Sequence, residues 1–255
     1  MTILLLETAT TVCSAALSVD GAIVALRESH EPNAHSSRLS VFIQELFAES
    51  HLEMRQLDGV CVSSGPGSYT GLRIGVSSAK GICYALGIPL LSVPTLQNMA
   101  NRYFELHPDY KGLVCPMIDA RRMECYTGFY NRQGEVRETR AEIIEPGIYD
   151  AWLDEGEVTF IGDGAEKTRP LLSSHPNAHY ADCSVSAVGM VHLAEQQLAA
   201  GIHEDVAYFE PFYLKDFVAK KSVVHGLRAE NGERKTESGK RKAESGKRRT
   251  KSGER

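Results

Sequence analysis

The sequence contains no run of about eighteen apolar residues, which is the length that a membrane-spanning helix needs, so we expect no membrane span. The first residues, MTILLLETAT, have no basic segment before their short apolar stretch, which predicts a first strand rather than a signal peptide. The six cysteines include no CxxC pair and lie mostly in apolar runs. This pattern favours buried, reduced thiols in a cytoplasmic protein over a zinc site or a disulfide framework.

Basic charge is concentrated at the end of the chain. The whole sequence has a net charge of −5, whereas residues 226–255 hold eleven Lys and Arg against five Asp and Glu, a net charge of +6. Residues 1–225 therefore carry −11, which makes a poor surface for nucleic acid. The basic segment repeats ESGKRKA and ESGKRRT without apolar residues at coiled-coil positions, so its composition predicts a disordered tail.

The first half of the chain has the periodicity of an α/β domain. A meander of three strands, with Asp20-Gly21 as a hairpin turn, precedes alternating helices and strands. The helix at 36–49 carries an apolar stripe of helical spacing, and the helix at 72–86 ends at Gly87. The remaining expected elements are strands at 3–7, 13–19, 23–28, 57–63 and 90–93 and a helix at 95–106.

The second half repeats this order. Expected strands at 113–119, 124–130 and 135–141 come before a strand at 158–162 and an amphipathic helix at 186–200. The repetition predicts a duplicated fold in which each group of strands begins antiparallel and continues parallel.

A glycine-rich loop, SSGPGSYTGLRIG at residues 63–75, is the strongest local signal. It follows an expected strand and opens a helix, where free backbone N–H groups and a helix N-terminus can hold an anion. The loop matches neither a Walker A motif nor GxGxxG, and the chain has no GxSxG nucleophile elbow. A tight turn whose glycines allow close packing explains the same residues equally well, so both interpretations stay open.

Other polar groups in the first half carry weaker signals. Glu7 and Thr8 end the first strand, where actin-like and sugar-kinase folds hold phosphate and support Mg²⁺, although a polar turn is the simpler explanation. His30 and His35 lack the i, i+4 spacing of a helical metal pair, so we expect a surface loop and a helix start there.

Two short segments of the second half are ambiguous. Residues 119–122, Asp-Ala-Arg-Arg, suit either an anion clamp or a solvated strand end. Residues 162–165, Gly-Asp-Gly-Ala, predict a turn before a helix.

The helix at 72–86 is narrow on several sides. Small residues let another helix approach closely, which favours a packed interface within the chain or between chains. These residues are Gly75, Ser77, Ser78, Ala79 and Gly81.

Taken together, the motifs resemble the TsaB (YeaZ) family. The blocks ILLLETAT, GPGSYTGLRIGVSSAKG, ALGIPLLSVPTL, DARRMECYTG and PFYL follow in order from Met1 to about Leu214, and the glycine block is very specific. The resemblance implies two actin-like (RNase H-like, ASKHA) domains of mixed sheets flanked by helices, at residues 1–107 and 108–225, before the tail at 226–255. It also implies a role in making threonylcarbamoyladenosine beside the anticodon of tRNA. Older names call such chains glycoprotease-like or peptidase M22-like.

The family's pathway includes the catalytic subunit TsaD and the ATPase TsaE. TsaD has two metal-binding histidines after its own glycine loop, and Thr95 and Met99 occupy the matching positions here. Neither a hydroxyl nor a thioether suits a site that needs neutral imidazoles four residues apart. The resemblance therefore implies the scaffold without the metal site: no catalytic or metal-binding residue, and no enzyme activity by this chain alone.

The resemblance also implies a partner surface, because the first two helices form a bundle with the partner in the family. The same faces are available for self-pairing, so we expect a homodimer that competes with TsaD. We expect tRNA, ATP and Mg²⁺ to bind within the complex, with no cofactor held firmly by this chain alone. The expected interface residues are Leu39, Phe42, Ile43, Leu46, Arg73, Ser77, Lys80 and Tyr84, and the weaker nucleotide-loop candidates are Glu7, Thr8, Gly65, Gly67 and Gly71.

Alternatives to this interpretation stay open. An actin-like ATPase or small-molecule kinase would use Glu7 with residues 65–71 and 162–164, whereas a peptidase would need a nucleophile or metal set that the sequence does not show. The tail suits either recruitment of tRNA through phosphate contacts or a solubilising extension, of which the second is the simpler.

Overall fold

The computed structural model describes residues 1–31 and 35–214, and every structural statement below refers to this part of the chain. The basic tail that the sequence predicts at 226–255 lies outside it. Within the described residues, no helix combines the length and the apolar character that crossing a membrane requires.

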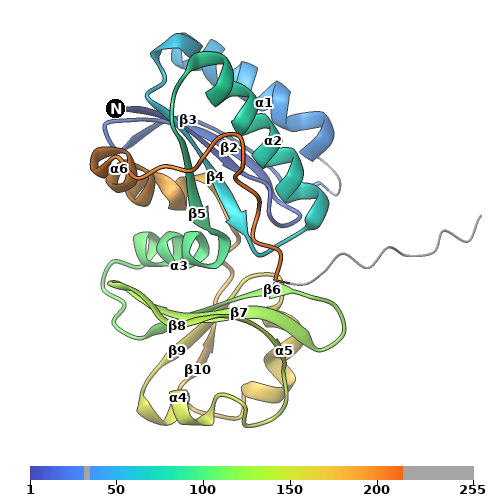
Figure 1. Ribbon diagram of the computed structural model, residues 1–255. Helices are drawn as coiled ribbons and strands as arrows, with labels where there is room; N and C mark the ends of the chain where they lie inside the picture. The colour runs from blue at the N-terminus through green and yellow to red at the C-terminus, as the bar shows by residue number, and fades with distance from the viewer. Residues whose placement is uncertain (32–34, 215–255) are drawn as a thin grey trace, which may run out of the picture. The chain divides into compact units, whose positions relative to one another are not determined.

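The first of two sheets is built on the meander and the glycine loop (Figure 1). Its central strand β1 (Thr2–Glu7) pairs antiparallel with β2 (Cys13–Val19), which pairs antiparallel with the edge strand β3 (Ala22–Ser29). On its other side β1 pairs parallel with β4 (Gly59–Gly65), and β4 pairs parallel with β5 (Leu90–Pro94).

The second sheet has the same order. Here β6 (Leu113–Asp119) is central, with antiparallel β7 (Glu124–Asn131) and β8 (Gly134–Ile143) on one side. On the other side lie parallel β9 (Val158–Ile161) and β10 (Ala178–Tyr180). The prediction of a duplicated α/β fold with two mixed sheets is confirmed.

Each sheet is covered by helices on both faces. One face of the first sheet packs against α1 (His35–Ser50) and α2 (Tyr69–Leu86), because alternate residues of β1 such as Leu4 and Leu6 point toward them. The opposite face, which includes Ile3 and Leu5, packs against the 3₁₀ helix η2 and helix α6 from the end of the described chain, at Ala187–Met190 and Val191–Ala200.

The second sheet is covered in the same way, with one helix from the first half. Its outer face packs against α4 (Asp150–Glu155) and α5 (Ala165–Leu172). Its other face packs against α3 (Thr95–Leu106), which follows β5. A division between residues 107 and 108 separates the strands of the two sheets, but α3 and α6 each pack on the sheet of the other half.

Local sequence explains most element ends. Asp20 and Gly21 both have positive φ, 48° and 78°, as a two-residue hairpin turn requires, and Gly87 ends α2 with φ 67°. The helix predicted at 72–86 begins earlier, at Tyr69, because Ser68 is its N-cap and accepts a hydrogen bond from the Gly71 amide. The helix predicted at 186–200 begins as η2, with Ser186 as its cap.

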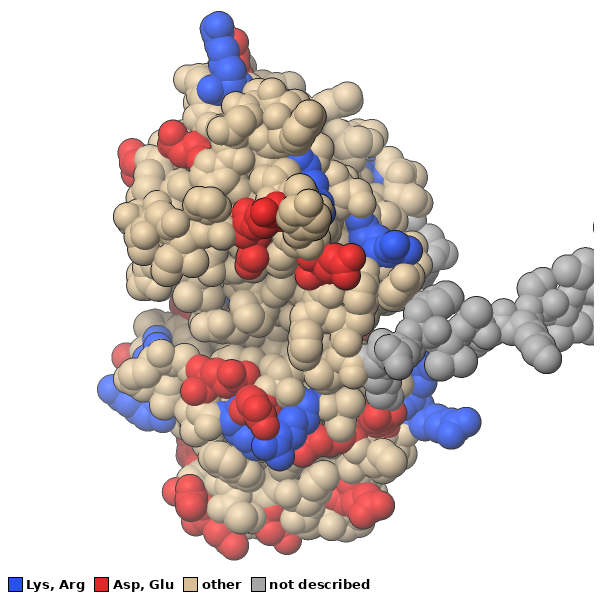
Figure 2. All heavy atoms as spheres, in the orientation of Figure 1, with Lys and Arg blue, Asp and Glu red and all other residues tan. Residues whose placement is uncertain are grey.

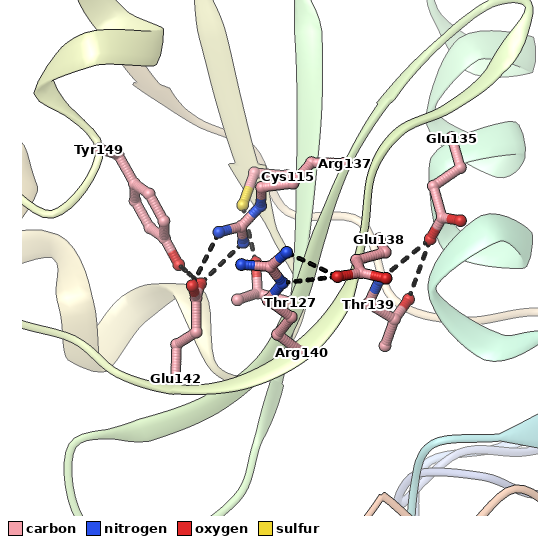
Figure 3. Close-up of polar contacts among 9 residues, drawn as sticks. All are labelled: Cys115, Thr127, Glu135, Arg137, Glu138, Thr139, Arg140, Glu142 and Tyr149. Atoms are coloured by element: carbon pink, nitrogen blue, oxygen red, sulfur yellow. Dashed lines mark hydrogen bonds and ion pairs between the residues drawn. The ribbon is translucent and has the colours of Figure 1, made fainter.

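A polar cluster links β8 to the segment that leads into α4 (Figure 3). Arg137 donates two hydrogen bonds of 2.7 Å to Glu142, and the Tyr149 hydroxyl donates a third of 2.7 Å. Burial opposes ionisation of Glu142, but these hydrogen bonds outweigh it and lower the pKa of the carboxyl. The guanidinium of Arg137 also lies 4.7 Å from the centre of the Phe129 ring, so the pair is held on several sides.

The cysteines are buried, as predicted, and all six are free thiols. Burial raises the pKa of Cys13, Cys83 and Cys183 to about 11, which keeps them protonated near neutral pH.

Candidate functional site

The glycine loop between β4 and α2 packs against the turn that follows β1. A Cβ atom added to Gly67 would collide with the Ala9 carbonyl oxygen, and one added to Gly71 would collide with that of Thr8. The Ser68 amide donates to the Ala9 carbonyl over 2.6 Å, and the Thr8 hydroxyl donates to the Gly71 carbonyl over 2.8 Å. The position that a side chain would take at each glycine is therefore occupied by the chain's own backbone, which explains why residues without side chains are needed there.

Gly65, at the end of β4, lies close to a second segment of backbone, at Phe212. It has φ 108°, and an added Cβ would lie 2.5 Å from the Phe212 carbonyl oxygen. The Phe212 amide donates to the Ser64 carbonyl over 2.7 Å. The loop is thus bounded by the β1–β2 turn on one side and by the end of the described chain on the other.

Glu7, the other weak nucleotide candidate, is fully buried beneath this loop. Its carboxylate accepts hydrogen bonds from the Ala9 amide at 2.7 Å, from the Asn98 side chain at 2.5 Å and from the Ser63 hydroxyl. Burial raises the pKa of Glu7, although the three donors act in the opposite direction. The carboxylate therefore joins β1, β4 and α3, and all three described donors come from the chain itself.

Thr95 and Met99, at the positions of the metal-binding histidines in the resemblance, are also buried. Met99 is part of the apolar core that α3 forms with the second sheet, and Thr95 is the first residue of that helix. Nowhere in residues 1–31 and 35–214 do three His, Cys, Asp or Glu side chains lie close enough together to hold a metal ion. These residues do not fit a metal centre of the TsaD kind.

The remaining weak candidates lie in loops and element ends. His30 is exposed, whereas His35 begins α1 and is buried, with its Nε2 2.7 Å from the Thr10 carbonyl oxygen. Residues 119–122 form the β6–β7 turn, in which Arg121 and Arg122 both have positive φ and are exposed. The Gly-Asp-Gly-Ala segment at 162–165 is the turn before α5, as predicted.

The structure corrects the part of the predicted partner surface that lies on α1. Four apolar residues of α1 are between 0% and 7% exposed, because the stripe packs on the chain's own first sheet. They cannot contact a partner while that sheet is covered. They are Leu39, Phe42, Ile43 and Leu46.

The predicted interface residues on α2 are more exposed than those on α1. Arg73, Ser77 and Tyr84 are exposed along one side of the helix, and Tyr84 is 85% exposed. Arg73 lies over the ring of Tyr69, 5.0 Å from its centre. Lys80 lies in the same stripe, but its ammonium donates to two backbone carbonyls of the chain, those of Ala207 and Phe209. Two of its three N–H donors are therefore used within the chain, and direct contact of Lys80 with a partner stays a prediction.

Sequence reasoning missed the residues that connect distant parts of the chain. Asn98 lies 91 positions from Glu7, and Phe209 lies 129 positions from Lys80. The one available signal was Asn98 itself, a polar residue within the apolar face of a helix.

Charges of both signs are mixed on the surface. On the face drawn in Figure 2, Lys and Arg side chains are interspersed with Asp and Glu. Elsewhere among the described residues the structure records ion pairs, as between Arg27 and Glu45 at 2.9 Å and between Arg27 and Glu49 at 2.6 Å. Mixed charges give little electrostatic attraction for a polyanion on this face.

Comparison with known proteins gives consistent results. The family model described as "TsaD: tRNA N6-adenosine threonylcarbamoyltransferase" matches residues 29–245. The tRNA threonylcarbamoyladenosine biosynthesis protein TsaB of Escherichia coli is 32% identical over 88% of this chain and 98% of its own length. The protein of the same name from Bacillus subtilis is 34% identical over 68% of this chain and 69% of its own length.

Solved structures share the fold. YeaZ from Pseudomonas aeruginosa superposes with a TM-score of 0.69 at 26% identity, covering 84% of this chain and 99% of that one. Another crystal structure, described as an uncharacterized protein with similarity to peptidase YEAZ from the same organism, gives a TM-score of 0.72 at 28% identity, with the same coverage.

Proposed function

Because the chain belongs to the TsaB (YeaZ) family of tRNA threonylcarbamoyladenosine biosynthesis proteins, we propose that it is a non-catalytic subunit that holds a TsaD-type catalytic subunit through the outer side of α2. In this proposal the chain supplies a surface and the partner supplies the chemistry.

The internal contacts of the glycine loop support the non-catalytic part of the proposal. The Ser68 amide donates to the Ala9 carbonyl and the Gly71 amide donates to the Ser68 hydroxyl, so two N–H groups that an anion could use are paired within the chain. The carboxylate of Glu7 is bound by three donors of the chain itself. These groups therefore hold the fold together, and nucleotide with Mg²⁺ is assigned to the assembled complex with TsaD- and TsaE-type subunits.

The exposed side of α2 is the single observation that carries the interface. Its stripe combines small and large residues, Ser77 beside Arg73 and Tyr84, and stays uncovered at these three positions. Tyrosine and arginine are enriched at protein interfaces, and a small residue between them allows close approach of a second helix. The occupant that we propose is a TsaD-type subunit, because the family resemblance implies this partner and the TsaD family model matches this chain. The same surface would support a homodimer when TsaD is absent.

The test is binding of a TsaD-type subunit to the Ser77→Arg variant. A bulky charge at this exposed position should weaken the complex at least about tenfold by blocking close approach, measured by calorimetry. The matched control is Ser174→Arg, an exposed serine after α5 that should bind like the wild type. Wild-type affinity for Ser77→Arg would contradict the proposed surface, and ATP turnover by the isolated chain would favour an actin-like ATPase instead.

A further inference from the structure

The chain after α6 returns along α2 and can be followed in orange in Figure 1. We call residues 204–213 the strap. At its start, the Glu204 amide donates to the Leu90 carbonyl over 2.8 Å, and the Ser92 hydroxyl donates to the Glu204 carboxylate over 2.6 Å. Near its other end, the Phe212 amide donates to the Ser64 carbonyl. The strap is thus fixed at both ends to the first sheet.

Lys80 fastens the middle of the strap. Its ammonium lies 3.0 Å from the Ala207 carbonyl oxygen and 2.9 Å from that of Phe209, so the two bonds bracket Tyr208. The side chain of Phe209 turns inward and packs on the core of the first sheet. Tyr208 turns outward and is 84% exposed.

The strap runs antiparallel to α2, because its middle contacts Lys80 and its end contacts Tyr69. At its end the ring of Tyr213 lies 4.7 Å from that of Tyr69, in the first turn of the helix. From Lys80 back to Tyr69 the helix rises about 16 Å, at roughly 1.5 Å per residue. The five residue-to-residue steps from Tyr208 to Tyr213 span about the same distance when extended, at roughly 3.3 Å each. The two segments therefore match in length between these contacts.

We propose that the partner surface is composite: α2 contributes Tyr84, the strap contributes Tyr208, and Lys80 is the positioning residue that holds the strap in place. Tyr84 follows Lys80 by four residues and so lies one turn further along the same side of the helix. Tyr84 on the helix and Tyr208 on the strap are each more than four-fifths exposed. Lys80 acts through the strap, because two of its three N–H donors bind the carbonyls on either side of Tyr208.

This inference rests on the proposed function, because the partner that binds the composite surface is the same TsaD-type subunit. The strap and the proposed surface on α2 are continuous, because the strap contacts α2 at Lys80 and again at Tyr69. This continuity supports the same subunit as the partner for both. A partner that contacts the exposed side of α2 at Ser77 meets the strap beside it.

The experiment measures affinity for the TsaD-type subunit and amide hydrogen exchange in the full chain. Lys80→Met removes the donors and keeps the side-chain length, so exchange at Glu204 and Phe212 should accelerate and affinity should fall about tenfold. Lys80→Arg keeps donors and should restore most of the affinity. Tyr208→Ala should also weaken binding about tenfold but leave exchange in the strap unchanged, because its ring is exposed. Ser174→Arg is the control in both measurements.

The outcomes separate the two proposals. If Ser77→Arg blocks the complex while Lys80→Met and Tyr208→Ala bind like the wild type, the strap is not part of the surface and the inference is wrong. If Ser77→Arg also binds like the wild type, the proposed function fails with it. A wild-type unfolding midpoint for Tyr208→Ala shows that its loss of affinity reports the surface and not the fold.

Discussion

Single residues in the glycine loop are defined by what they touch. Gly71 and Gly81 lie in the same helix, but a Cβ at Gly71 would meet the Thr8 carbonyl oxygen, whereas one at Gly81 would meet no atom within 4 Å. The first glycine is required by packing and the second is not. Close packing on the β1–β2 turn is therefore sufficient to explain glycine at position 71.

The two glycines give a matched pair of variants. Gly71→Ala should lower the free energy of unfolding by about 1–3 kcal/mol, because backbone must move to admit the methyl group. Gly81→Ala should raise it by roughly 0.5–1 kcal/mol through better helix propensity. Denaturant unfolding of both variants measures this, and a Gly71→Ala protein as stable as the wild type would contradict the packing.

Glu7 shows how a buried carboxylate is retained when its own chain supplies the donors. Its raised pKa means that the folded protein binds more protons than the unfolded chain between the ordinary value of 4.5 and the folded value. The contribution of Glu7 to stability therefore decreases as pH rises through this window, and is largest below it.

The Glu7→Gln variant lacks this titration. The free energy of unfolding of the wild type, relative to the variant, should therefore fall as the pH rises above the ordinary pKa of 4.5. Unfolding by denaturant at several pH values gives the difference. The control is Glu155→Gln, at an exposed position. A Glu7→Gln difference that is constant with pH would show that the carboxyl titrates alike in both states.

At the scale of elements, α1 and α2 differ in which of their sides are buried. The stripe of α1 builds the core of the first sheet, and α2 adds an outer side that the strap partly follows. Periodicity alone cannot predict this difference, because an apolar stripe looks the same whether it meets its own sheet or a second chain.

Leu46 tests this assignment. The side chain is fully buried, so Leu46→Ala should cost about 2–5 kcal/mol of stability, measured by denaturant unfolding. Val41, on the same helix and 38% exposed, is the control, and Val41→Ala should change stability far less. If Leu46→Ala weakened partner binding without loss of stability, α1 would belong to the interface after all.

The sequence predicts the elements better than their long-range contacts. The α1 stripe, the Asp20-Gly21 turn and the repeated strand order follow from local periodicity and turn chemistry. The contacts of Asn98 with Glu7 and of Lys80 with the strap join positions more than ninety residues apart, and no local pattern encodes them. The α2 start at Tyr69 was missed because the cap, Ser68, lies inside a loop that already had another explanation.

At the scale of the whole molecule, each of the two similar halves packs its last described helix on the sheet of the other half. Helix α3 covers the second sheet and α6 covers the first, so each sheet depends on residues from the other half of the sequence. The described chain also carries mixed surface charge on the face drawn in Figure 2. Mixed charge gives this face little electrostatic attraction for nucleic acid.

Formation of threonylcarbamoyladenosine in a reconstituted system is the most direct test of this account. TsaD- and TsaE-type subunits, tRNA, ATP and the threonylcarbamoyl donor are combined with increasing amounts of this chain, and the modified nucleoside is quantified. The account predicts a rate that rises with the chain and levels off at a fixed ratio to the TsaD-type subunit, with no product when that subunit is omitted. A full rate without this chain, or product formed by this chain with the TsaD-type subunit left out, would contradict it.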